Sequence, residues 1–364
     1  MELTIIIATS LYAALVVYLG VGLVRASKIN SEDSYEPTIS IIVAARNEET
    51  HIRECLRSLI RLDYPREKLE AIIVNDGSID RTREITEEIV RSHPWMKLVC
   101  TTPGEGNLKG KSNAVSAGIQ SSRGEILMFT DADCSVPPQW VRETARCFDE
   151  RTGIVGGYTL LEAHRVFEGM QALDWIFLFG LAASTAGWKI PLTAIGNNLA
   201  VRRSAYDATG GFRDIPFSVT EDYALVRAIL QKSQLEVRFP VEPKTVVRSK
   251  ACPTWSQLYR QKQRWGVGGL DMVLWGMIIM CVGWMFRFSL ILGCFFAPPL
   301  ATLGAAACLM LLDLCYLSLP LKRFGRLRYL KYFPAFELYF SLYVLLIPIV
   351  AMLSKNVVWK ERKL

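Results

Sequence analysis

The sequence predicts a mainly parallel, Rossmann-like α/β domain that is held at a membrane by apolar helices near both ends of the chain. Two observations lead to this prediction. Between residues 38 and 148, short apolar runs alternate with amphipathic stretches, as in parallel sheets with helical connections. Outside this region, several apolar runs reach about twenty residues, the length needed to cross a bilayer. The hydrophobic share of 51% fits such a chain.

The first apolar run covers residues 3–24 and is followed directly by Arg25 and Lys28. A cleaved signal peptide would carry its positive charges before the apolar run, and none precede it here. We therefore predict an uncleaved anchor over residues 1–28. Basic residues favour the cytosolic side of a membrane, so we expect the following domain in the cytosol.

The charge and the cysteines argue against other classes of protein. The formal net charge is +7, but no arginine-rich tail or nucleic-acid motif accompanies it. We therefore assign the surplus to the cytosolic face of a membrane and expect no nucleic-acid partner. The nine cysteines are scattered without a Cys-x-x-Cys pair, so they indicate neither a zinc site nor a disulfide framework.

In the first half of the chain the alternation predicts a series of strands and helices. The predicted strands are 38–45, 69–75, 96–101 and 126–130, and the predicted helices are 48–61, 80–92 and 111–121. The run 126–129 is wholly apolar, which is typical of a strand buried on both faces of a parallel sheet.

Polar loops follow three of these strands. They read Arg46-Asn47-Glu48, Asp76-Gly77-Ser78 and Asp131-Ala132-Asp133. The carboxyl ends of parallel strands share one edge of the sheet, and open α/β sheets bind ligands there. The two carboxylates of the third loop suit Mg²⁺ or Mn²⁺ that bridges to phosphate. Taken alone, Asp-x-Asp in a turn is more often ordinary turn chemistry.

The second half of the chain is less regular before it becomes apolar. Residues 154–247 contain Gly-rich turns and a predicted helix over 222–231. Residues 254–265, within a segment that we delimit as 251–269, mix aromatic and basic side chains. This mixture is typical of a helix in the membrane interface, although an ordinary amphipathic surface helix has the same composition.

Residues 270–354 form a predicted membrane region with spans at 270–296, 299–321 and 334–353. Basic residues crowd the loop at 322–331 and mark it as cytosolic. Three spans would then put the C-terminal tail outside, whereas its own basic residues favour the cytosol. A last segment that is broken near Pro348, and that re-enters or lies in the interface, would resolve this conflict.

The order of short motifs resembles glycosyltransferase family 2, the inverting enzymes of the GT-A fold, in its membrane-anchored branch. The motifs are T-I-S-I-I-V-A-A-R-N-E-E at 38–49, N-D-G-S-I-D at 75–80, G-K-S-N-A at 110–114, T-D-A-D at 130–133, G-N-N at 196–198, T-E-D at 220–222 and Q-K-Q-R-W at 261–265. Each motif alone is weak, but seven in the family's order make a specific signal. The resemblance implies a cytosolic GT-A domain over residues 38–250.

The resemblance also implies roles for single residues on the donor side. Ala45, Glu48 and Asp76 would hold the base and ribose of a nucleotide diphosphate sugar, UDP-linked in our prediction, and Lys111 would lie near the diphosphate. Asp133 would bind Mg²⁺ or Mn²⁺ directly, and Asp131 would assist it while leaning toward the ribose. Without the resemblance, an Asp-Gly turn at residue 76 and a solvated lysine at residue 111 would be the favoured explanations.

On the acceptor side, the resemblance makes Asp222 the general base that takes the proton from the acceptor hydroxyl. Glu221 is its competitor, and helix capping is the alternative for either acid. Gln261, Arg264 and Trp265 form the pattern Gln-x-x-Arg-Trp, in which arginine can bind phosphate and tryptophan offers an apolar platform for the acceptor. Arginine and tryptophan are also common anchors at membrane interfaces.

The small number of predicted spans favours addition of one sugar to a membrane lipid that enters from the bilayer. In this respect the chain resembles ceramide glucosyltransferase-like enzymes and enzymes that modify carotenoids or hopanoids. We expect an integral protein of a bacterial inner membrane with its catalytic domain in the cytosol. Three alternatives stay open, namely a processive polysaccharide synthase, a nucleotidyltransferase and a non-catalytic membrane scaffold.

Overall fold

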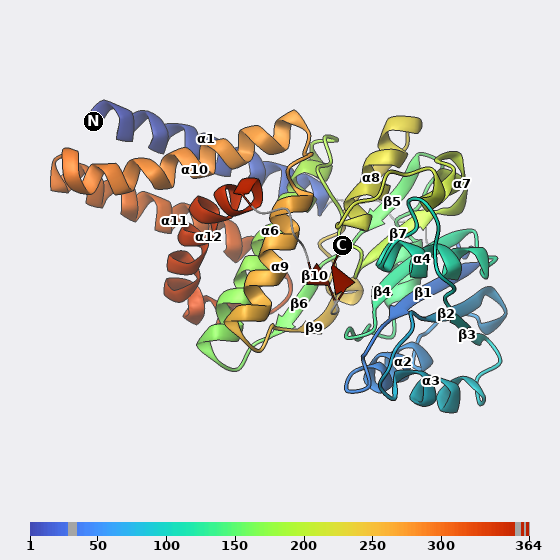
Figure 1. The fold of residues 1–364 in the computed structure, drawn as a ribbon. Coiled ribbons are helices and arrows are strands. Elements are labelled where there is room, and N and C mark those ends of the chain that lie inside the picture. The colour runs from blue at the N-terminus through green and yellow to red at the C-terminus, as the bar shows by residue number, and fades with distance from the viewer. Residues whose placement is uncertain (28–34, 354–357, 360–361, 364) are drawn as a thin grey trace. The chain divides into compact units, whose positions relative to one another are not determined.

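The computed structural model describes residues 1–27, 35–353, 358–359 and 362–363, and the chain divides into two compact units (Figure 1). Of the described residues, 1–26, 161–192 and 251–353 form the helical unit. The sheet unit contains residues 27, 35–160, 193–250, 358–359 and 362–363. The predicted domain 38–250 therefore contains a segment, 161–192, that belongs to the helical unit.

A seven-stranded sheet with the order β3-β2-β1-β4-β7-β5-β8 forms the centre of the sheet unit. Its strands are β1 (Ile39–Ala45), β2 (Leu69–Asn75), β3 (Met96–Cys100), β4 (Ile126–Asp131), β5 (Thr152–Gly156), β7 (Leu199–Arg202) and β8 (Glu236–Arg238). Strand β1 pairs in parallel with β2 and β4, and β2 pairs in parallel with β3. Only β7 runs antiparallel to its neighbours, β4 and β5. The predicted, mainly parallel α/β sheet is confirmed.

Helices cover both faces of this sheet. Ile41 and Val43 of β1 share one buried cluster with Leu56 of α2 (Ile52–Ile60), whereas Ile42 faces α4 (Lys111–Gln120). A Cβ on Gly118 of α4 would lie only 2.7 Å from the Ile42 side chain, so the glycine permits this close packing. Burial on both faces explains why β1, β2 and β4 are almost wholly apolar.

The remaining elements of the sheet unit are short. The helices are α2 (Ile52–Ile60), α3 (Thr82–Val90), α4 (Lys111–Gln120), α5 (Trp140–Ala145), α7 (Arg203–Ala208) and α8 (Glu221–Lys232), with 3₁₀ turns η1 (Arg66–Lys68), η2 (Gly211–Arg213) and η3 (Pro243–Thr245). Two further pairs of strands are β6 (Thr159–Glu162) with β9 (Val247–Lys250), and β10 (Val358–Trp359) with β11 (Arg362–Lys363).

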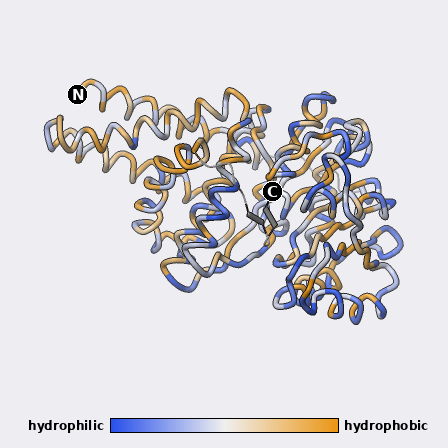
Figure 2. Tube along the Cα trace, in the orientation of Figure 1, coloured by the Kyte–Doolittle hydropathy of each residue, from blue (hydrophilic) through white to orange (hydrophobic). Residues whose placement is uncertain are grey.

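The helical unit contains the long apolar helices, which are α1 (Glu2–Ala26), α6 (Val166–Gly187), α10 (Leu274–Phe296), α11 (Pro299–Arg323) and α12 (Phe333–Leu353), with the 3₁₀ turn η4 (Leu327–Tyr332) before α12. It also contains the shorter, more polar helix α9 (Trp255–Gly268). Within the described part of the chain, five helices are long and apolar enough to span a membrane, including those near each end (Figure 2). Helix α12 continues through Pro348, so the break suggested there is wrong.

The sequence did not predict α6, because its apolar residues are mixed with Glu168, Gln171 and Asp174 and its hydropathy is the lowest of the five. In α6, 72% of the most apolar stretch of 18 residues is buried inside the protein. In the other four helices, the corresponding share is 22–33%. Strands of one sheet, β5 and β7, precede and follow α6 in the chain. We conclude that α6 does not cross a bilayer, because a single crossing would separate these paired strands.

Polar side chains from four helices meet inside the helical unit. Arg287 of α10 donates to Asp313 of α11 at 2.7 Å and lies 3.5 Å from Glu337 of α12. The hydroxyl of Tyr12 in α1 donates to the second oxygen of Asp313 at 2.5 Å. Ser341 of α12 donates to Glu337 at 3.2 Å. Charged groups among apolar helices are costly unless they are paired, so this network fixes the four helices against one another.

We expect Asp313→Asn to destabilise the protein by about 3–5 kcal/mol, because it leaves the buried Arg287 guanidinium without its main counter-charge. The apparent melting temperature of the protein in detergent micelles measures this effect. Glu87→Gln is the control, since it removes an exposed ion pair with Arg83 on α3. Equal melting temperatures for the two variants would contradict the prediction.

Candidate active site

Three polar loops lie at one edge of the sheet unit. The parallel register places Ala45 of β1 opposite Asn75 of β2, and Ala44 opposite Asp131 of β4. The loops that follow these strands therefore begin side by side. The Asp76 N–H donates to the Ala45 carbonyl at 2.9 Å, which joins the first two loops directly.

Asp76 is buried in this edge, with 3% of its surface exposed. The Thr101 hydroxyl donates to its carboxylate at 3.0 Å, and the Arg46 guanidinium donates to its carbonyl at 2.6 Å. In the neighbouring loop, the Glu48 N–H donates to the Thr82 hydroxyl at 2.7 Å. These bonds hold the residues predicted to bind the nucleotide in a fixed arrangement.

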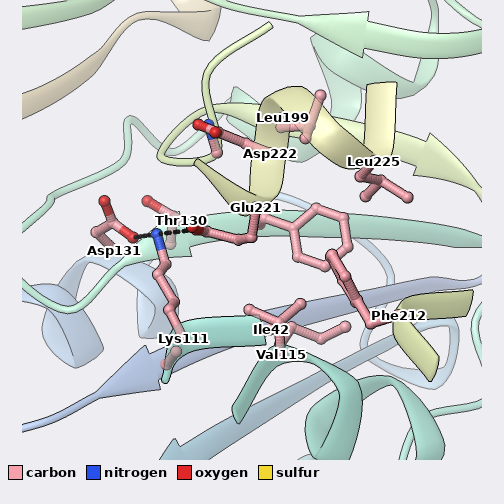
Figure 3. A pocket seen from close by; sticks show the side chains of 13 residues that line it. Ile42, Lys111, Val115, Thr130, Asp131, Leu199, Phe212, Glu221, Asp222 and Leu225 are labelled. Carbon is pink, nitrogen blue, oxygen red and sulfur yellow. Dashed lines mark hydrogen bonds and ion pairs between the residues drawn. The ribbon is translucent and has the colours of Figure 1, made fainter. Parts of the chain in front are cut away.

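Lys111 lies at the start of α4 and bridges two acids (Figure 3). Its ammonium is 2.7 Å from Asp131 Oδ1 and 3.0 Å from Glu221 Oε1. Burial alone would lower the pKa of Lys111, but the two carboxylates outweigh burial and raise this pKa well above its ordinary value. Lys111 is therefore a permanent cation that joins the end of β4 to the start of α8.

Asp222 is the second residue of α8, and both of its oxygens accept hydrogen bonds from the backbone. Oδ2 accepts from the Gly196 N–H at 2.7 Å, and Oδ1 accepts from the Tyr223 N–H at 2.8 Å. Burial and the neighbouring Glu221 carboxylate raise the pKa of Asp222, while Lys111 and the two N–H groups oppose the rise. The result is a fixed carboxylate that binds a proton more readily than an exposed aspartate does.

Gly196 belongs to the G-N-N motif and explains how the loop approaches Asp222. A Cβ on Gly196 would lie 3.1 Å from the Asp222 Cβ, which is tighter than ordinary contact. A side chain at position 196 would therefore press against the Asp222 side chain. The sequence pointed to the motif, but it did not indicate that the backbone of residue 196 would orient the predicted base.

A small cavity of about 20 Å³ lies between these groups, enough for about one water molecule. Lys111, Asp131, Glu221 and Asp222 line it together with Gly196, and the other lining side chains are almost all apolar, as Figure 3 shows for Ile42, Val115, Leu199, Phe212 and Leu225. The apolar lining keeps water away from one side of the charged groups. Interactions among these charges are therefore stronger than they would be in bulk water.

The end of β4 also offers ligands for a divalent cation. Asp131 and Asp133 supply hard carboxylate oxygens, and Mg²⁺ bound to a diphosphate needs only one or two such ligands from the protein. Among the residues that the structure describes, no group of three His, Cys, Asp or Glu side chains could hold a metal alone. Since Asp131 is already paired with Lys111, Asp133 fits the role of direct ligand better.

Two buried thiols lie beside these acids, and no sequence motif predicts these contacts. The Cys55 thiol lies 3.6 Å from the Asp131 carbonyl, and the Cys134 thiol lies 3.5 Å from Asp133 Oδ1. Burial and the nearby Asp133 and Asp131 carboxylates raise the pKa of both thiols far above the ordinary value. Both cysteines therefore keep their protons at neutral pH.

The other predicted site residues, Gln261, Arg264 and Trp265, lie on α9 of the helical unit. The structure thus brings together Asp76, Lys111, Asp131, Glu221 and Asp222 with the loop of Ala45 and Glu48. The convergence of α9 with this site stays a prediction.

Two family descriptions match the chain. "Glycosyl transferase family 2" matches residues 40–210, and "Glycosyl transferase family group 2" matches residues 126–355.

Several curated proteins are similar in sequence. "Probable glycosyltransferase YdaM" of Bacillus subtilis is 31% identical over 65% of this chain and 56% of its own length. "Beta-monoglucosyldiacylglycerol synthase" of Synechocystis is 29% identical over 65% of this chain and 49% of its own length. "Poly-beta-1,6-N-acetyl-D-glucosamine synthase" of Staphylococcus epidermidis is 26% identical over 69% of this chain and 59% of its own length. The chain thus spans about half the length of the curated relatives that it matches.

Among solved structures, the mannosyltransferase PcManGT from Pyrobaculum calidifontis, in complex with GDP-Man and Mn²⁺, has a similar fold. The TM-score is 0.60 at 20% sequence identity, and the match covers 92% of this chain and 99% of that one. This likeness identifies the fold as GT-A.

The raised pKa of Asp222 predicts a pH dependence of stability. The folded protein binds a proton at Asp222 more tightly than the unfolded chain does, so this contribution is fully present below the ordinary carboxyl pKa of about 4 and is lost as the pH rises through the folded pKa. We expect the melting temperature of the wild type to fall relative to that of Asp222→Asn as the pH rises from about 4 to 7.

The control for this comparison is Asp207→Asn, which changes an exposed acid of α7 in the same unit. Its melting temperature is expected to follow that of the wild type at every pH. Parallel curves for the wild type and Asp222→Asn would show that the buried acid has an ordinary pKa.

Proposed function

Because the chain belongs to glycosyl transferase family group 2, we propose that it is an inverting glycosyltransferase that transfers one sugar from a nucleotide diphosphate sugar to a membrane lipid. The donor in this proposal is UDP-linked. The acceptor is the hydroxyl of a glycolipid precursor, a carotenoid or a hopanoid. The observation that carries the proposal is the carboxylate of Asp222, which two backbone N–H groups orient beside the Lys111–Asp131 pair.

Asp222 acts as the general base. Its raised pKa makes it a stronger base than an exposed aspartate, and its fixed orientation avoids a loss of side-chain entropy during the reaction. The acceptor oxygen attacks the anomeric carbon of the sugar, the bond to the nucleoside diphosphate breaks on the opposite side, and the acceptor proton moves to Asp222. Glu221 is less suited to this role, because its carboxylate is paired with Lys111.

The residues proposed to bind the donor lie on the side of the site opposite Asp222. Asp76 accepts hydrogen bonds from the base or ribose, with Ala45 and Glu48 in the neighbouring loop, and Lys111 supplies positive charge for the diphosphate. A Mg²⁺ or Mn²⁺ ion held by Asp133, with Asp131 beside it, would neutralise the charge that grows on the departing diphosphate. The structural neighbour PcManGT is in complex with GDP-Man and Mn²⁺, which agrees with such a cation.

A lipid acceptor is supported by the apolar helices and by the relative named as a monoglucosyldiacylglycerol synthase. In this proposal residues 1–28 and 270–354 anchor the protein in a bacterial inner membrane. Residues 38–250 carry the reaction in the cytosol. Residues 251–269 lie in the interface, where Gln261, Arg264 and Trp265 contact the diphosphate and the acceptor.

A processive polysaccharide synthase is the second candidate. The similarity to a poly-beta-1,6-N-acetyl-D-glucosamine synthase favours it. Against it stands the small number of spans, since four apolar helices of the described residues remain when α6 is excluded, too few to suggest a channel for a growing polymer.

Purified protein with Mn²⁺, radiolabelled UDP-sugars and a lipid extract is expected to label one lipid class, and Asp222→Asn is expected to reduce the rate by about 10²–10⁴-fold. The exposed Asp207→Asn variant should keep the wild-type rate. Thin-layer chromatography and gel electrophoresis of the product separate a one-sugar lipid from polymer. A polymeric product would support the second candidate, and an active Asp222→Asn enzyme would overturn the assignment of the base.

Removal of divalent cations is expected to abolish transfer, and added Mn²⁺ is expected to restore it. Asp133→Asn should raise the Mn²⁺ concentration for half-maximal rate by about tenfold or more. Asp149→Asn is the control, because Asp149 pairs with Arg238 away from the cavity residues. Full activity in the presence of a strong chelator would exclude the cation from the mechanism.

A further inference from the structure

A lysine is almost completely buried in the helical unit. Lys262 of α9 and Asp174 of α6 form an ion pair in which each side chain is only 3% exposed. Lysine is rarely buried to this extent unless it is paired. Lys262 lies within Q-K-Q-R-W, at a position to which the resemblance assigned no role.

The Lys262 ammonium also contacts two aromatic rings. It lies 4.2 Å from the centre of the Trp265 ring on the same helix and 4.7 Å from that of Tyr343 on α12. Positions 262 and 265 are three residues apart, so their side chains share one face of α9. A cation that lies over the face of an aromatic ring is attracted to that ring, and the attraction is stronger where water is excluded. Lys262 thus holds the Trp265 ring on one side. The Trp175 ring of α6 packs nearby, and the centres of the Trp175 and Trp265 rings are 5.6 Å apart.

The charge of Lys262 depends on Asp174. Burial lowers the pKa of Lys262 below its ordinary value, and the Asp174 carboxylate opposes that change. The Tyr339 hydroxyl of α12 donates to Asp174 at 3.3 Å and fixes this carboxylate. Asp174 is therefore needed to keep a charged ammonium under the Trp265 ring.

Other contacts already hold the start of α9 against α6. The amide of Gln171 in α6 donates to the Cys252 carbonyl at 3.1 Å and accepts from the Cys252 N–H at 2.9 Å. The Thr254 side chain caps α9 by accepting from the Gln257 N–H. A buried ion pair adds little net stability compared with apolar residues of similar volume. The Lys262–Asp174 pair is thus a costly way to attach α9 and calls for another explanation.

We propose that Lys262 and Asp174 form a positioning pair that fixes the Trp265 ring as the platform for the lipid acceptor. Lys262 acts through Trp265 and touches no reacting atom. This inference rests on the proposed function, because it assumes that Trp265 contacts the acceptor. It adds two residues of the helical unit to those that determine how the acceptor binds.

The test compares Lys262→Met, Asp174→Asn and the double variant that carries both changes. Each single change leaves one buried charge without its partner and is expected to lower the melting temperature. The double variant removes both charges and is expected to recover most of that loss. Its kcat/KM for the lipid acceptor is nevertheless expected to stay about tenfold below the wild type, because the cation no longer holds Trp265. The KM for the UDP-sugar should not change.

A mutant cycle compares Trp265→Ala, the double variant, and the variant that carries all three changes. Because Lys262 acts through Trp265, adding Trp265→Ala to the double variant should cause no further loss of acceptor kcat/KM. Lys262→Arg keeps the cation and should retain most of the activity. The pair is structural and the inference is wrong if the double variant recovers lipid transfer together with its melting temperature. The same conclusion follows if the losses of acceptor kcat/KM caused by Trp265→Ala and by the double variant are additive.

A measurement without turnover separates this inference from the proposed function. In protein labelled with 5-fluorotryptophan, the ¹⁹F resonance of Trp265, assigned with Trp265→Phe, is expected to shift in the double variant. Asp313→Asn is the control, since it breaks a different buried pair of the same unit and should leave this resonance in place. An unshifted resonance in the double variant overturns the inference even in an active enzyme. A wild type that labels no lipid overturns the proposed function, whatever the resonance does.

Discussion

The site depends on one ammonium that is shared by acids far apart in the sequence. Asp131 ends β4, and Glu221 and Asp222 begin α8, so three carboxylates meet in a partly apolar place where they repel one another. Lys111 contacts the first two and lowers the electrostatic cost of all three. It also joins the parallel half of the sheet, where β4 lies, to α8, which follows the antiparallel strand β7. The geometry of the site and the stability of the sheet unit therefore rest on the same cation.

The parallel half of the sheet could be predicted closely because its strands are buried on both faces. The apolar runs at 38–45, 69–75 and 126–130 match β1, β2 and β4 within one residue. The first helix was predicted from residue 48 but begins at Ile52, because the Thr82 hydroxyl and the Asp80 carboxylate accept the N–H groups of residues 48 and 49 in a loop. Helix α6 was missed because tertiary packing, which a sequence pattern does not contain, buries its polar residues.

Motif order identified the acids of the site, but it did not identify their partners. The contact of Lys111 with Glu221, the hydrogen bond from Gly196 to Asp222, and the ion pair of Lys262 with Asp174 all join residues that are remote in sequence. Such pairs arise only when the sheet and the helices have assembled, and no local propensity encodes them. Asp76, Lys111, Asp131, Glu221 and Asp222 thus lie at one edge of the sheet unit, while the hydrogen bonds and ion pairs that orient them became visible only in three dimensions.

The buried thiols of Cys55 and Cys134 have a consequence for the reactivity of the chain near Asp131 and Asp133. Burial and the adjacent carboxylates raise the pKa of both thiols, so both sulfurs stay protonated at neutral pH. The thiolate, rather than the thiol, is the form of cysteine that acts as a nucleophile. The same surroundings protect the two cysteines from oxidation, which proceeds through the thiolate. Two cysteines can therefore lie beside the carboxylates at the end of β4 without becoming reactive nucleophiles.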